Sequence, residues 1–382
     1  MPSEALEIMS KNFWLICGVV LLMLVYFLLA TPAMNDDGFY YEGFTESLAK
    51  GKLDFKSFYG FQGLSFFAVP IFWLTGSHNS IIIASVIFSL LSIPLAFLVG
   101  RAYYGSDKAG WYFLSLFLLI PYPYTTMFRG FQESALLFFI LLILYGSFQN
   151  KNWTPLTWAI GGIVKPFALA LFPLWLKKIL NRKRIIWIAL ALLIGAVYLG
   201  TSYYQTGHLV NNAAINSYQG NFDTGNPPPL EESFVPSIKG YLRVGANLFL
   251  SFRKILISPL VIILGVLSLW FGKSLKLRKE IILSIILNFF LVGSLTFSFP
   301  KYLLPMVALF ALAAMPYLMK YFWLRILVII DSFFVFKPIF DHFGHNFWPS
   351  FYLYLFPLFL VFIIFIVLEL TRRKTKSFKT TT

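Results

Sequence analysis

The chain has 382 residues, of which 58% are hydrophobic, 19% aromatic and only 12% charged, and its mean hydropathy is +0.75. A water-soluble domain cannot bury that much apolar surface, so the composition excludes a soluble protein and predicts one that crosses a membrane many times. Lys and Arg number 31 against 16 Asp and Glu, and we attribute this excess to basic cytoplasmic loops rather than to nucleic-acid binding.

The apolar segments predict twelve membrane segments, with both termini in the cytoplasm. Residues 154–175 are expected to form a hairpin of two short helices that turns at Lys165-Pro166. A single span there would place the basic cluster that follows it on the outer side, against the usual charge bias. The other ten segments are simple apolar runs at 12–31, 79–100, 109–122, 131–148, 185–204, 254–272, 280–298, 302–319, 322–336 and 351–371.

Two adjacent acids, Asp36 and Asp37, follow the first apolar run in the stretch NDDGFYYEG. A helix through DGFYYEGFTESLAK would have its N-cap at Asn35 or Asp36 and Gly51 just past its last residue. One acid suffices to cap a helix and offset its dipole, so the pair indicates a chemical role at the outer membrane surface, with capping by both acids as the alternative.

This motif resembles the GT-C class of membrane glycosyltransferases. The likeness is closest to the branch that contains the dolichyl-phosphate-mannose mannosyltransferases and the bacterial transferases that add aminoarabinose or galacturonic acid to lipopolysaccharide. Those families commonly show an acidic pair, a tyrosine four residues after the first acid, and an ending with Leu, a small residue and Gly. In this sequence the matching residues are Asp36, Asp37, Tyr40, Leu48, Ala49 and Gly51.

Three further stretches are similar to these families. RGFQESALLFFILLILYG places Glu133 at the start of a span, GGIVKPFALALFPL places Lys165 at a hairpin tip, and FPKYLLPMVALFALAA has Lys301 where Arg is usual. The likeness is strongest over residues 12–205 and fragmentary after that. We therefore expect a GT-C-like catalytic membrane module at 1–205, an outer loop at 206–253, and C-terminal membrane helices with a basic cytoplasmic tail at 254–382.

The resemblance implies an all-α polytopic membrane protein, a GT-C-like bundle of about twelve membrane segments with amphipathic helices on its outer face. It also implies an inverting glycosyltransferase that moves a sugar from a polyprenyl phosphate or diphosphate to a lipid, glycan or protein. Asp36 or Asp37 would take the proton of the attacking hydroxyl. The remaining carboxylates, with Glu133 and Glu42, would orient the acceptor, or Asp36, Asp37 and Glu133 would bind a divalent cation, Mg²⁺ or Mn²⁺.

Cations near the leaving phosphate would stabilise its developing charge. Lys165 lies in an apolar segment, where a lysine is costly unless it is paired or functional. Arg129 and Lys301 lie at expected membrane boundaries, so an ordinary interfacial location of their side chains is the alternative. The expected phosphate-binding residues are Lys165, Arg129, Lys301 and Arg243, and His345, Tyr40 and Tyr41 are expected near them.

Two other functions compete with this interpretation. A transporter or lipid flippase would place ionisable groups within its spans, and Asp331 is the clearest such group here. A polysaccharide polymerase or ligase would carry a late outer loop rich in Arg and His, which residues 205–253 lack. We therefore expect an inner- or plasma-membrane enzyme with its active site on the outer face. Its partners would be a polyprenyl-phosphate sugar, the acceptor and membrane lipids, with no nucleic acid.

Overall fold

The computed structural model describes twelve stretches of the chain, and all regular structure in them is helical, without a β-strand. Apolar side chains dominate these helices, as expected for elements surrounded by lipid and by each other. The described residues are 2–28, 34, 36–58, 60–76, 79–120, 130–176, 182–210, 236–249, 257–272, 275–295, 300–343 and 355–380.

The helices follow one another along the chain with short connections in most places. They are α1 (Pro2–Leu28), α2 (Asp36–Ala49), α3 (Gly63–Thr75), α4 (Ser80–Tyr104), α5 (Asp107–Leu118), α7 (Glu133–Phe148), α8 (Thr154–Val164), the 3₁₀ helix η2 (Pro166–Leu171), α9 (Pro173–Leu176), α10 (Arg182–Thr206), α12 (Ile238–Phe249), α13 (Pro259–Phe271), α14 (Arg278–Gly293), the 3₁₀ helix η3 (Pro300–Leu303), α15 (Leu304–Lys320), α16 (Phe322–Phe343) and α17 (Leu355–Thr380).

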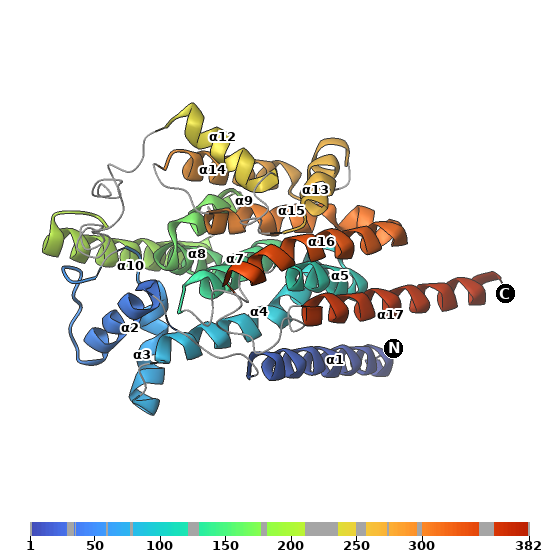
Figure 1. Ribbon diagram of the computed structural model, residues 1–382, viewed down its shortest axis with the longest axis horizontal. Coiled ribbons are helices and arrows are strands. Elements are labelled where there is room, and N and C mark those ends of the chain that lie inside the picture. The colour runs from blue at the N-terminus through green and yellow to red at the C-terminus, as the bar shows by residue number, and fades with distance from the viewer. Residues whose placement is uncertain are drawn as a thin grey trace.

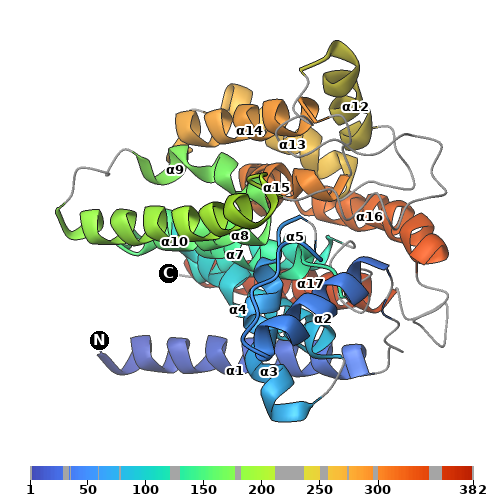
Figure 2. The same cartoon turned by 90° about the vertical axis from the view of Figure 1, so that its left-hand side faces the viewer.

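Most of the long helices lie side by side in one bundle. The start of α1 and the end of α17 lie at the same end of that bundle, and α2 and α3 lie at the other end (Figure 1). Figure 2 shows α12 at the same end as α2, again away from the two termini. This arrangement agrees with the predicted topology, in which both termini share one side of the membrane and the acidic helix is on the other.

The core of the bundle is one continuous cluster of buried apolar side chains, drawn from helices between α1 and α17. Helix α15 is its most buried long helix, with Leu304 to Met315 enclosed on all sides. Glycines allow the closest helix contacts. A Cβ at Gly100 of α4 would lie 2.6 Å from the carbonyl oxygen of Ala109 in α5, and one at Gly265 of α13 would lie 2.7 Å from that of Phe310 in α15. Such small residues let membrane helices approach closely.

Each of the twelve predicted membrane segments overlaps described helical structure. Within the described part of the chain, three helices are long and apolar enough to cross a membrane on their own: Ser80–Tyr104, Arg182–Thr206 and Lys301–Lys320. Several others are apolar but shorter than a full span. Helix α7, for example, has 16 residues, which is about 24 Å at 1.5 Å per residue. The shorter apolar helices are Asn12–Leu28, Gly63–Thr75, Glu133–Phe148, Thr154–Val164, Pro259–Phe271 and Leu355–Thr371.

The predicted hairpin within residues 154–175 is confirmed. Helix α8 ends at Val164, Lys165 is extended with φ −155° and ψ 134°, and Pro166 begins η2. Proline disfavours a helical conformation in the residue before it, which explains the break at Lys165. The two arms pack tightly, since a Cβ at Gly162 would lie 2.5 Å from the Leu169 side chain. The tip of the hairpin therefore holds Lys165 in a fixed, non-helical position.

Asp331, the acid within α16, caps the start of a neighbouring helix. Its Oδ2 accepts hydrogen bonds from the hydroxyl of Ser258 and from the backbone N–H of Leu260, the latter at 3.0 Å. These groups form the first turn of α13, where backbone N–H groups have no partner within the helix. A carboxylate there also offsets the helix dipole. Asp331 therefore has a structural role that accounts for an acid at this depth.

Candidate functional site

The first turn of α2 contains the two acids that we expect to be catalytic. Helix α2 begins at Asp36, and the side chains of Asp36 and Asp37 lie outside the described residues. At the other end the helix stops at Ala49, and Gly51 has a φ of +77° while its N–H donates to the Leu48 carbonyl at 2.9 Å. The predicted helix, with Gly51 as its C-terminal cap, is confirmed.

The segment that leads into α7 packs directly against this first turn of α2. Gly130 has a φ of +76°, and a Cβ on it would lie 3.0 Å from the Cα atom of Gly38. Only glycine fits both this backbone conformation and this close approach. Glu133 follows three residues later at the start of α7. The fold therefore brings the start of α7 and the start of α2 to the same place.

Glu133 lies at the centre of a buried ionic cluster. Its Oε1 is 3.3 Å from the Nζ atom of Lys165 and 3.3 Å from that of Lys301. The side chains are 1% exposed for Glu133, 12% for Lys165 and 8% for Lys301. These three residues come from α7, from the tip of the α8–η2 hairpin and from η3. The structure thus brings into contact three residues that three separate sequence motifs had indicated.

Aromatic rings enclose the two ammonium groups. Nζ of Lys301 is 4.6 Å from the centre of the Phe131 ring, and Nζ of Lys165 is 5.7 Å from that of Tyr302. The Tyr302 ring stacks on Phe167, with centres 4.2 Å apart and planes inclined by 18°. Cation–π contacts of this kind stabilise a lysine that has left water. The stack also ties η2 to η3, the two elements that carry the lysines.

The described charges of the cluster are two ammonium groups and one carboxylate. Both lysines also have interactions beyond these two contacts. No group in the described part of the chain donates a hydrogen bond to Oε2 of Glu133. The cluster therefore offers two buried cationic groups and a carboxylate oxygen that can accept a hydrogen bond.

Gln132 was not singled out by the sequence, but it fixes the entry to α7. Its side chain accepts a hydrogen bond from the N–H of Leu64 at 3.4 Å and donates one to the carbonyl of Phe61. The Phe131 carbonyl accepts a hydrogen bond from the Ser85 hydroxyl at 3.1 Å. The sequence signal that could have identified Gln132 is its place directly before Glu133, the acid of the motif. Its hydrogen bonds indicate that it positions Glu133.

Glu42 anchors the start of α4. Its Oε1 accepts a hydrogen bond from the Ser80 hydroxyl at 2.6 Å, and its Oε2 accepts one from the Ile81 N–H at 2.8 Å. Burial raises the pKa of Glu42, although these hydrogen bonds oppose the shift. Both oxygens are used by the protein itself. We therefore assign Glu42 to the attachment of α2 to α4 rather than to the predicted orientation of an acceptor or metal, since a carboxylate capping a helix start fully explains it.

The other predicted site residues are spread more widely. Tyr41 is buried, and its carbonyl accepts hydrogen bonds from Thr45 at 2.7 Å and Ser65 at 2.9 Å, while Tyr40 is half-buried. Arg243 lies on α12, a helix that contacts η3. The remaining two expected residues, Arg129 and His345, lie outside the described residues.

The predicted Mg²⁺ or Mn²⁺ site fits Glu133 poorly. A divalent cation at its Oε1 would stand next to two ammonium groups, and like charges at that distance repel strongly. Among the described side chains there is no group of three His, Cys, Asp or Glu residues suited to a metal. Because the side chains of Asp36 and Asp37 are not among them, the metal remains a prediction.

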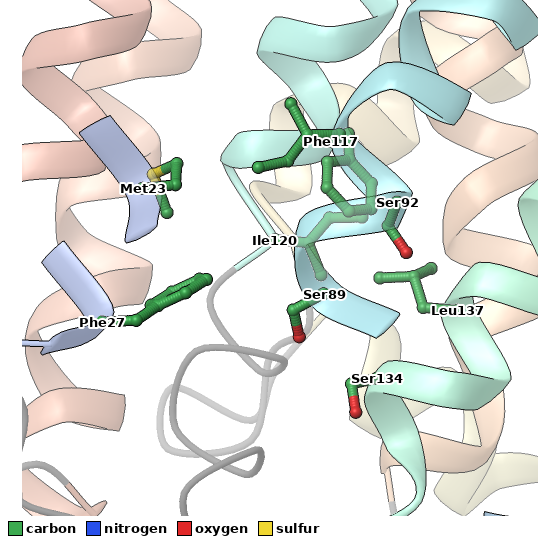
Figure 3. A pocket seen from close by; sticks show the side chains of 9 residues that line it. Met23, Phe27, Ser89, Ser92, Phe117, Ile120, Ser134 and Leu137 are labelled. Atoms are coloured by element: carbon green, nitrogen blue, oxygen red, sulfur yellow. The ribbon is translucent and has the colours of Figure 1, made fainter. Parts of the chain in front are cut away.

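A small cavity lies beside α7, between α1, α4 and α5 (Figure 3). The hydroxyls of Ser89 and Ser134 face it, and neither has a hydrogen-bond partner in the described part of the chain. Ser92 also lines the cavity, and the other lining residues are apolar, with Met23 and Phe27 from α1 among them. The space is about enough for one water molecule, which would satisfy such hydroxyls.

The fold is similar to that of ArnT from Cupriavidus metallidurans. Against the crystal structure in the apo state the TM-score is 0.58, at 14% sequence identity over 94% of this chain and 77% of that chain. Against the crystal structure bound to undecaprenyl phosphate it is 0.54, with the same identity and coverage. No protein-family model and no curated protein matches the sequence. The chain therefore has the fold of ArnT, a GT-C polytopic membrane protein, and the predicted GT-C-like helical bundle is confirmed.

Proposed function

We propose that this protein is an inverting glycosyltransferase that takes its sugar from a polyprenyl-phosphate carrier at the outer face of the membrane. The observation that carries the proposal is the convergence of Lys165 and Lys301 on Glu133, next to the first turn of α2. The ArnT fold supports it, because one of the similar structures is bound to undecaprenyl phosphate.

The two lysines would bind the phosphate of the carrier. As the bond between the sugar and the phosphate breaks, negative charge collects on the phosphate oxygens, and preorganised cations stabilise it most in a site shielded from water. Glu133 holds both ammonium groups by one oxygen, so they need little reorganisation when the carrier arrives. Each lysine offers a compact point charge rather than the planar fork of an arginine.

Asp36 or Asp37 would act as the general base. The acceptor hydroxyl attacks the anomeric carbon from the side opposite the phosphate, and the carboxylate takes its proton, which gives inversion in a single displacement. The acceptor is a lipid, glycan or protein. Glu133 Oε2 could accept a hydrogen bond from a hydroxyl in this region, because no described group donates to it.

A transporter has less support. Asp331, the acid that best fitted a transport pathway, caps α13. The charges of the Glu133 cluster lie at helix ends near α2 and not along the middle of the spans. No described feature therefore favours a transport pathway over a transfer site.

Binding and transfer can be tested separately on the full chain in lipid nanodiscs. Thermal stability is measured with and without undecaprenyl phosphate, and transfer is measured with a panel of polyprenyl-phosphate sugars, including aminoarabinose, mannose and galacturonic acid. At a carrier concentration of 100 times its Kd, binding stabilises the folded state by about 2.7 kcal/mol. We expect Asp36→Asn/Asp37→Asn to keep this stabilisation and lose transfer.

Lys165→Met/Lys301→Met should lose the stabilisation as well. The matched control is Lys52→Met, because Lys52 is an exposed lysine just after the end of α2. The proposal fails if neither undecaprenyl phosphate nor any carrier-linked sugar stabilises the wild type and no sugar is transferred. Chelation by EDTA tests the metal, since a Mg²⁺- or Mn²⁺-dependent transferase would lose activity.

A further inference from the structure

Helix α12 differs from its neighbours in direction and in composition. It crosses the end of α14 rather than running beside it, at the same end of the bundle as α2 (Figure 2). Its sequence, IKGYLRVGANLF, contains two basic residues and no acid. A short helix across the end of a membrane bundle is placed to lie along the membrane surface.

One face of α12 is fixed to α14 by close contacts. A Cβ at Gly240 would lie 2.0 Å from the carbonyl oxygen of Gly293, so the two backbones meet there without side chains between them. The Tyr241 ring stacks on Phe289, with centres 5.7 Å apart, and its hydroxyl is 3.1 Å from the Ser294 hydroxyl. Val244 is fully buried. These contacts define which way the rest of the helix faces.

The opposite face exposes apolar and basic side chains side by side. Ile238 is 79% exposed and Leu242 is 69% exposed. They are four residues apart and therefore share one stripe of the helix. Lys239 and Arg243 form the next stripe with the same spacing, Lys239 exposed and Arg243 half-buried. Apolar and cationic stripes in this order are typical of helices that lie in a lipid interface, with apolar side chains among the acyl chains and cations at the phosphates.

The lipid-facing surface of α14 ends where α12 begins. Along α14 the large exposed apolar side chains are Leu283, Ile286, Leu287 and Phe290, and Gly293 touches α12 directly after them. Tyr241 packs edge-on against Phe290, with ring centres 5.4 Å apart. The exposed apolar surface of α14 therefore ends at its contact with Gly240 and Tyr241 of α12. We infer that α12 lies where this apolar surface ends, at the boundary between acyl chains and headgroups.

We propose that the exposed face of α12 is a binding surface for anionic lipid headgroups in the outer leaflet. Lys239 and Arg243 contact the lipid phosphates, while Ile238 and Leu242 enter the upper acyl-chain region. Because α12 also contacts η3, which carries Lys301, this surface gathers lipid phosphates next to the buried cluster. The lipid contact itself is argued from α12 and α14 alone, whereas its place in the outer leaflet and beside the buried cluster rests on the proposed function.

The membrane location can be tested with one fluorescent label. The chain has a single cysteine, Cys17, so Leu242→Cys in a Cys17→Ser background carries an environment-sensitive dye at one position. In nanodiscs we expect nitroxide-labelled lipids to quench this dye and aqueous iodide to quench it weakly. The matched control is Lys52→Cys in the same background, where the exposed position after α2 should give the opposite pattern.

The preference for anionic lipid is tested by comparing quenching by an anionic lipid with quenching by a zwitterionic lipid. At equal mole fraction, nitroxide-labelled phosphatidylglycerol should quench the dye at position 242 several-fold more than nitroxide-labelled phosphatidylcholine. Each lysine or arginine near the membrane surface strengthens binding to anionic lipid by a factor of about five. Adding Lys239→Gln/Arg243→Gln should remove this preference, whereas Lys50→Gln/Lys52→Gln, just after the end of α2, should keep it.

Three results would overturn the proposal. Equal quenching by the two lipids in the otherwise wild-type chain would rule out recognition of anionic headgroups. Strong quenching by iodide would put α12 in water. A dye shielded from both iodide and lipid would mean that another protein surface, such as a second copy of this chain, covers α12.

Discussion

Replacing Glu133 by glutamine should destabilise the protein more than removing either lysine that it contacts. At an effective dielectric constant of 20, each contact of 3.3 Å corresponds to an attraction of about 5 kcal/mol. Because both Nζ atoms lie 3.3 Å from the same oxygen, they are at most about 6.6 Å apart, and their repulsion is about 2.5 kcal/mol or more. Glu133→Gln removes both attractions and leaves this repulsion.

Lys301→Met has a smaller expected effect. It removes one attraction, but it also removes the repulsion between the lysines and the cost of burying one ammonium group, which is several kcal/mol. The remaining Lys165–Glu133 pair has balanced charges. We therefore expect Glu133→Gln to lower the free energy of unfolding by about 3–5 kcal/mol, as for other broken buried ion pairs, and Lys301→Met to lower it by about 1 kcal/mol or less.

Denaturant unfolding in mixed micelles, followed by tryptophan fluorescence and extrapolated linearly to zero denaturant, measures these differences. Ser134→Ala is the matched control, because Ser134 is the next residue on α7 and its hydroxyl has no hydrogen-bond partner in the described part of the chain. If Glu133→Gln proves as stable as Lys301→Met, the carboxylate does not hold the two lysines together and the electrostatic reasoning is wrong.

Three more predictions concern neighbouring residues. Lys301→Arg should retain sugar transfer within a few-fold, since the charge is kept, and loss of transfer to the level of Lys301→Met would contradict this. Tyr302→Phe should keep carrier binding, while Tyr302→Leu should weaken it about tenfold by removing the stack on Phe167; equal Kd values for both variants would refute the role of the stack. The pKa of Glu42 in the folded state is raised above its ordinary value of 4.5. As the pH rises above 4.5, Glu42 therefore keeps its proton in the folded state after losing it in the unfolded state, and the free energy of unfolding should fall. Glu42→Gln should remove this dependence on pH, measured by unfolding from pH 4 to pH 7.

Periodicity and charge predicted the membrane segments, α2 and the hairpin, but not helices α3 and α12, which lie within the expected outer loops. The break at Lys165 follows from local chemistry, because proline restricts the residue before it and the basic cluster after α9 fixes the side of the membrane. Gly51 as the end of α2 also follows from a local rule. These features depend on residues close together in sequence, which is why the sequence alone contains them.

The meeting of Glu133, Lys165 and Lys301 could not be predicted in this way. Their separation along the chain carries no information about distance, and the motifs only mark each residue as unusual. Nothing in the sequence distinguishes Phe167 and Tyr302 from the other members of the 44 phenylalanines and 20 tyrosines. A stacked pair between two distant elements has no sequence signature of its own.

Glu42 shows how a buried acid can have a structural role that its position in the sequence does not indicate. On α2 it follows Asp37 by five residues and lies in the same polar stretch, so its position favoured a role in the reaction. Its partners are Ser80 and Ile81, at the start of another helix. Capping by an acid from a different helix does not follow the local spacing of ordinary caps. Asp331 of α16, which caps the start of α13, is a second case.

The ionic cluster also has a consequence for how the protein is made. Glu133 and Lys165 are synthesised together, as a pair of opposite charges that can enter the membrane with little penalty. Lys301 emerges only after more than one hundred further residues, and its contact with Glu133 exists only once Tyr302 of η3 has stacked on Phe167. If this cluster binds the carrier phosphate as proposed, a nascent chain cannot bind the carrier before η3 is in place.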